Sequence, residues 1–164
     1  MPILTPYQSA WDIGRIDTDV AYPLLKDTFR YGNIAEEGVL ADHFTQYNLR
    51  ASRAREAFAR VARALIDEGQ NDKALELLDK GLEVLPSPKI RYSDPNTYPF
   101  IEGYYSLGEW EKGDELMQGY IETLIEYIEY YLQFDGVQAS LVNNIIHEKM
   151  SSLFELYYLA AYAQ

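Results

Sequence analysis

The stretch from Arg55 to Pro86 constrains the fold most, because large, small and helix-breaking residues follow one another there at the spacing of two packed helices. The first helix ends at Gly69 and carries the apolar stripe Ala54, Phe58, Val61, Ala62 and Leu65. The second, capped by Asn71 or Asp72 and ended by Pro86, carries Ala74, Leu75, Leu78, Leu82 and Leu85. A connection this short predicts an antiparallel hairpin.

Small residues fall where such a hairpin would bring its two helices closest. Ala62, Ala74 and Gly81 permit a close approach, and we expect Ala62 to face Ala74 while Asp79 faces outward. This order is close to that of a tetratricopeptide repeat, a helix pair of about 34 residues. A second, blurred unit follows, in which the places of Leu65, Gly69, Ala74 and Leu78 are taken by Tyr104, Gly108, Gly113 and Met117. Any antiparallel bundle can show similar stripes, so this interpretation competes with a plain helical bundle.

The rest of the chain is also expected to be helical. We predict a first helix over Thr18–Tyr31, a loop from Pro86 to Asn96, a long helix over Trp110–Phe134 and a last helix to Ala163. The buried stripe of the long helix is expected to be Met117, Tyr120, Ile121, Leu124, Ile128 and Tyr131. That of the last helix is expected to be Val142, Ile146, Met150, Leu153, Phe154 and Tyr157.

The fold class predicted is therefore all-α, with tetratricopeptide-like antiparallel helix pairs in a right-handed superhelix, an irregular N-terminal arm and a C-terminal capping helix. We expect one domain over 1–164. It comprises an arm over 1–17, a repeat over 50–86, a degenerate second repeat over 97–134 and a capping helix over 137–163.

Composition excludes several classes of function. The 14 Lys and Arg residues against 26 Asp and Glu give a net charge of -12, which repels nucleic acid and anionic lipid. Without Cys the chain has no disulfide, thiolate nucleophile or thiolate-bound zinc. No stretch approaches the roughly 20 apolar residues of a membrane span. We expect that the chain itself does not span a membrane.

Two acidic residues resemble a metal-binding motif. Asp17 and Asp19 have the Asp-x-Asp form by which some glycosyltransferases hold a divalent metal, but carboxylates at the start of a helix are better explained as caps. His147 is followed by Ser151 where a zinc-protease helix needs a second His. We therefore expect no catalytic residue, no cofactor and no metal.

Fifteen Tyr residues suit either the rim of a helical core or a binding surface. On a tetratricopeptide unit the concave face is lined by positions 2, 5, 9 and 12 of the first helix. Glu56 stands at position 2 here. The residues predicted to bind a protein or peptide partner are Ala59, Arg63, Ile66, Tyr98, Glu102 and Tyr105. The alternatives are a structural tail that dimerises through its Tyr-rich last helices and, least favoured, a metal-dependent enzyme fragment. A flat apolar patch on the last helices would favour the structural, dimerising tail.

Four segments carry a family resemblance: Thr5-Pro6, the run from Trp11 to Asp19, the run from Ala64 to Gly69, and Lys73-Ala74. They resemble the C-terminal soluble part of a group of Bacteroidetes multi-pass membrane proteins whose N-terminal part resembles protein O-mannosyltransferases. The resemblance implies a non-enzymatic interaction or scaffolding module. It also implies attachment to a membrane-spanning region absent here, and a place on the periplasmic side of the inner membrane.

Overall fold

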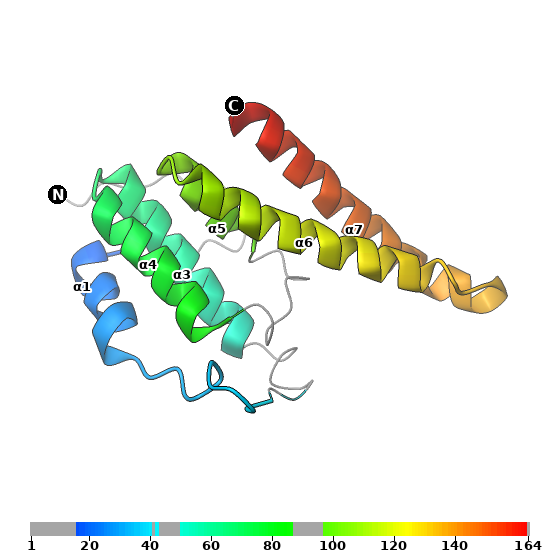
Figure 1. The fold of residues 1–164 in the computed structure, drawn as a ribbon, viewed down its shortest axis with the longest axis horizontal. Helices are drawn as coiled ribbons and strands as arrows, with labels where there is room; N and C mark the ends of the chain where they lie inside the picture. Colours follow the sequence, from blue (N-terminus) through cyan, green and yellow to red (C-terminus); the bar gives the residue numbers. More distant parts are fainter. Residues whose placement is uncertain (1–15, 41, 43–49, 87–96, 164) are drawn as a thin grey trace.

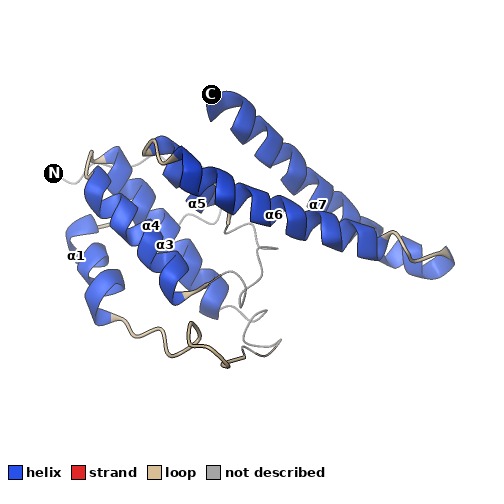
Figure 2. Ribbon diagram, in the orientation of Figure 1, coloured by secondary structure: helices blue, strands red, loops and turns tan. Residues whose placement is uncertain are grey.

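The computed structural model describes residues 16–40, 42, 50–86 and 97–163, and within them the chain is helical with no strand (Figures 1 and 2). The elements are α1 (Thr18–Pro23), a π-helical turn η1 (Leu24–Thr28), α3 (Arg50–Asp67), α4 (Asn71–Val84), α5 (Tyr98–Ser106), α6 (Trp110–Tyr131) and α7 (Gly136–Ala163). The all-α class is thus confirmed. The first helix is shorter than the expected Thr18–Tyr31, because its last turn widens into η1 and ends at Thr28.

Helices α3 and α4 lie side by side as the predicted hairpin (Figure 1), and they share the core with α5 and α6. Gly69 adopts a left-handed backbone with φ 76°, which ends α3 and turns the chain. Ala62 and Ala74 are both buried, at 1% and 0% exposed. The expected cap is wrong: Gln70 occupies the cap position of α4 and no side chain bonds to the free N–H groups there.

A buried guanidinium donates hydrogen bonds to the backbone at the other end of this hairpin. Arg55 is 1% exposed, and its Nε and Nη2 donate to the backbone oxygen of Leu85 at 3.1 and 2.6 Å. Leu85 directly follows α4, where helix carbonyls lack partners within the helix and where positive charge is favoured. Arg55 therefore joins the start of α3 to the end of α4.

Helix α5 packs against both α3 and α4, and α6 packs against α5. The close approach of α4 and α5 depends on glycine: a Cβ added at Gly81 would lie 3.0 Å from the rings of Phe100 and Phe58. Asp79 does not simply face outward as expected. Its carboxylate accepts from Tyr104 Oη at 2.9 Å, because α5 packs on α4, and from Lys112 Nζ at 2.7 Å, which reaches it from α6.

The first helical segment lies along the α3/α4 hairpin (Figure 1). Thr18 Oγ1 donates to Glu68 at 2.6 Å, and the ring of Tyr31 lies 5.3 Å from that of Phe58. Asp17 caps α1 by accepting from the backbone N–H of Val20 at 3.2 Å, as predicted. Of the expected arm over 1–17, residues 1–15 lie outside the described part of the chain.

Helices α6 and α7 form a long hairpin that extends away from this body, and the second half of α7 returns toward it (Figure 1). Helix α7 packs on α6 and α5. The buried stripe predicted for it is wrong at three positions, because Met150, Phe154 and Tyr157 are 42%, 60% and 69% exposed while Leu156 is buried. The face of α7 that meets its neighbours is therefore rotated from the one expected.

Candidate interaction surfaces

The predicted binding residues lie on two helices that pack side by side. Ala59, Arg63 and Ile66 belong to α3, and Tyr98, Glu102 and Tyr105 to α5. Arg63 Nη1 forms an ion pair with Glu102 Oε1 at 3.0 Å, across the two helices, and Arg63 Nε lies 3.4 Å from Asp67 Oδ1. The structure therefore brings Arg63 and Glu102 together on one partly exposed face, called the α3/α5 face below.

Other members of the predicted set support this face rather than form its surface. Ala59 is buried at 4% exposed, and Ile66 and Tyr98 are half-buried. Tyr105 is 9% exposed, its hydroxyl donates to Asp114 at 2.5 Å, and its ring centroid lies 5.3 Å from that of Trp110. Burial raises the pKa of Tyr105, and the bond to Asp114 raises it further. Tyr105 thus packs as a core residue.

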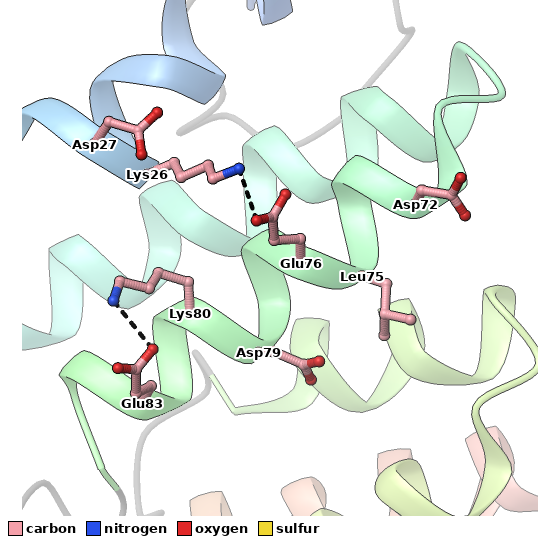
Figure 3. Close-up of a pocket in the computed structure, with 8 residues that line it drawn as sticks. All are labelled: Lys26, Asp27, Asp72, Leu75, Glu76, Asp79, Lys80 and Glu83. Atoms are coloured by element: carbon pink, nitrogen blue, oxygen red, sulfur yellow. Dashed lines mark hydrogen bonds and ion pairs between the residues drawn. The ribbon is translucent and has the colours of Figure 1, made fainter.

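An open groove of about 560 Å³ lies between η1 and α4, on another side of the hairpin (Figure 3). Its lining is mostly charged and comprises Lys26, Asp27, Asp72, Leu75, Glu76, Asp79, Lys80 and Glu83.

Most charges in this groove are already paired. Lys26 Nζ lies 2.7 Å from Glu76 Oε1, and Lys80 Nζ lies 3.0 Å from Glu83 Oε2 (Figure 3). The hydroxyl of Tyr22 also donates to Glu76. These hydrogen bonds, first that from Lys26, lower the pKa of Glu76, and the same bond raises the pKa of Lys26. The pair between Lys26 and Glu76 thus fastens η1 to α4, whereas the pair between Lys80 and Glu83 lies within α4.

Exposed apolar side chains gather on the α6/α7 hairpin, a feature that the predicted site residues do not include. On α6 and the turn after it they are Trp110, Ile125, Tyr130 and Leu132. On α7 they are Val137, Leu141, Met150, Phe154, Tyr157 and Tyr158. The signal available in the sequence was the continued recurrence of apolar residues on more than one side of the last helix.

Neither the pair Asp17 and Asp19 nor His147 of α7 belongs to a cluster of potential metal ligands in the described part of the chain. Over residues 16–40, 42, 50–86 and 97–163, the side chains of His, Asp and Glu form no cluster of three that could bind a metal ion. Asp17 acts as the cap of α1, and His43 lies outside the described residues. Among the helices of the described ranges, none combines the length and the apolar character needed to cross a membrane.

Comparison with known proteins gives no relative: no protein family, curated protein or solved structure matches the chain. The interpretation of its surfaces therefore depends on their geometry and chemistry.

Proposed function

We propose that the chain is a non-enzymatic, tetratricopeptide-like module that binds another protein through the α3/α5 face. The observation that carries this proposal is the ion pair between Arg63 and Glu102, because it joins the first helices of two successive hairpins. In solenoids of helix pairs, such side-by-side first helices line the surface that holds an extended peptide or a partner helix.

The charge of this face selects the class of partner. Glu56, Asp67 and Glu102 are exposed or partly exposed on α3 and α5, the two helices of this face, and the whole chain has a net charge of -12. A peptide that carries Lys or Arg would be attracted to this surface, whereas an acidic one would be repelled. The partner proposed is thus a basic segment of a protein.

The resemblance described above supports a cellular context for this module. We propose that it is the tail of a membrane glycosyltransferase-like protein and lies on the periplasmic side. Membrane-spanning segments encoded upstream of Met1 in the native gene would support this context, and a gene that starts at Met1 would contradict it.

Peptide display on the purified chain tests the binding role, followed by affinity measurements on charge-reversed variants. Glu102→Lys places a positive charge on the α3/α5 face and should weaken binding of the selected peptides by about tenfold or more. Glu115→Lys, a matched reversal at an exposed position of α6, should leave affinity within about twofold of the parent. Selected peptides that bind all three proteins equally would contradict the proposed surface, provided that circular dichroism shows each variant folded.

A second candidate function, a structural tail that dimerises its parent, is favoured by the exposed large side chains of α7.

A further inference from the structure

The second half of α7 has an apolar stripe on its outer side. Met150, Phe154, Tyr157, Tyr158 and Ala161 recur at the steps of three and four that place residues on one face of a helix. Their exposed state is not an effect of fraying, since α7 continues to Ala163. We call these five residues the outer stripe.

The same helix segment has a second apolar side that is already used. Leu153, Leu156 and Ala160 pack into or against the core, with Leu156 1% exposed. The four large residues of the outer stripe remain between 42% and 69% exposed. A helix that is apolar on both sides is normally covered on both sides. The outer stripe is thus a surface that calls for a partner.

We propose that the outer stripe packs against the outer stripe of a second copy of this chain, as an antiparallel, two-fold symmetric pair of α7 helices. A two-fold pair covers both stripes at once and leaves none open, since each copy presents the same patch. This dimer goes beyond the peptide-binding role of the α3/α5 face, because it uses other residues.

Charge favours a second copy at this place. Two chains that each have a net charge of -12 repel one another over most of their surfaces. Between Met150 and Ala161 the only charged residue is Glu155, which lies outside the stripe. Two copies can therefore approach here without placing rows of carboxylates opposite one another.

The exposed area is also of the right order. Met150, Phe154, Tyr157 and Tyr158 are 42%, 60%, 69% and 57% exposed. With roughly 200 Å² for a large side chain, they offer on the order of 450 Å² per copy, or about 900 Å² for a pair. A specific interface buries about 1,200 to 2,000 Å² in total, so the small residues and the polar rim beside the stripe need to contribute only the remainder.

Sedimentation velocity over a range of concentrations tests this dimer on the whole 164-residue chain. The parent should approach twice its mass of 18.9 kDa as concentration rises. Phe154→Glu and, separately, Tyr157→Glu should weaken self-association by about tenfold or more, because each places a carboxylate in the centre of the stripe. Leu141→Glu adds the same charge to the same helix at a position that is 73% exposed and off the stripe, and it should dimerise like the parent.

A parent that stays monomeric throughout would overturn the proposal. So would a dimer that survives both stripe substitutions, or one that Leu141→Glu disrupts equally. Circular dichroism identifies a variant that fails to fold, in which case the other stripe variant decides. A monomeric Phe154→Glu that still binds the selected peptides would show that the two proposals stand independently.

Discussion

Replacement of Gly113 by alanine should raise the stability of the protein if helix propensity dominates and lower it if packing dominates. The residue lies in α6, where replacement of glycine by alanine would ordinarily stabilise the protein by about 1 kcal/mol. A Cβ at this position, however, would lie 2.4 Å from Cε1 and 2.6 Å from Cδ1 of Tyr105. The ring cannot move aside easily, because its hydroxyl is bonded to Asp114 and its face packs near Trp110.

Overpacking of this kind costs about 1 to 3 kcal/mol, which exceeds the propensity gain. After the propensity gain of about 1 kcal/mol is subtracted, we expect Gly113→Ala to destabilise the chain by about 1 kcal/mol, with an upper bound of about 2 kcal/mol, and to lower its melting temperature by about 2 to 4 °C. In a Tyr105→Ala background the ring is gone, and the same substitution should become stabilising by up to about 1 kcal/mol.

Urea unfolding of the four proteins in this double-mutant cycle measures both effects. Reversal of sign between the two backgrounds is the expected signature of contact between Gly113 and Tyr105. If Gly113→Ala raises stability in the parent, or changes it equally in both backgrounds, the packing of α5 against α6 described above is wrong.

Two further predictions concern the hairpin and its tyrosines. Ala74→Leu should cost on the order of 1 to 3 kcal/mol in urea unfolding, because Ala74 is fully buried, whereas Glu56→Leu on the exposed side of α3 should change stability by less than about 0.5 kcal/mol; equal effects would contradict the close approach of the helices. Burial raises the pKa of Tyr31 from 10.0 to about 12, so its contribution to stability is complete below about pH 10 and is lost as pH rises toward 12. The urea midpoint of the parent should therefore fall more steeply between about pH 10 and pH 12 than that of Tyr31→Phe, and parallel curves would contradict this.

The hairpin could be predicted because its information is local. Gly69 ends the first helix at the turn, and Ala62 and Ala74, which were predicted to lie at the crossing, are both buried. The cap of α4 could not be predicted as well, because Asn71 and Asp72 both have suitable side chains, while the backbone places the cap at Gln70, one residue before Asn71 and two before Asp72.

Which side chains lie on the surface depends on tertiary contacts that the spacing of residues in the sequence does not predict. Asp79 has the spacing of an outward-facing residue of α4, but Tyr104 and Lys112 reach it from α5 and α6, which follow later in the chain. For the same reason the residues predicted to bind a partner divide into two groups. Arg63 and Glu102 meet on the surface, whereas Tyr105 turns inward to Trp110 and Asp114.

The last helix shows why periodicity alone cannot assign a face. Apolar residues are so frequent from Met150 onward that one stripe can be drawn through Phe154 and Tyr157 and another through Leu153 and Leu156. Hydrophobicity favours neither stripe strongly, so the positions of α5 and α6 decide between them, and they cover the stripe that includes Leu156. The stripe that α5 and α6 do not cover stays apolar and exposed. The property that made the sequence hard to interpret at this helix is therefore the one on which the proposed pairing with a second copy depends.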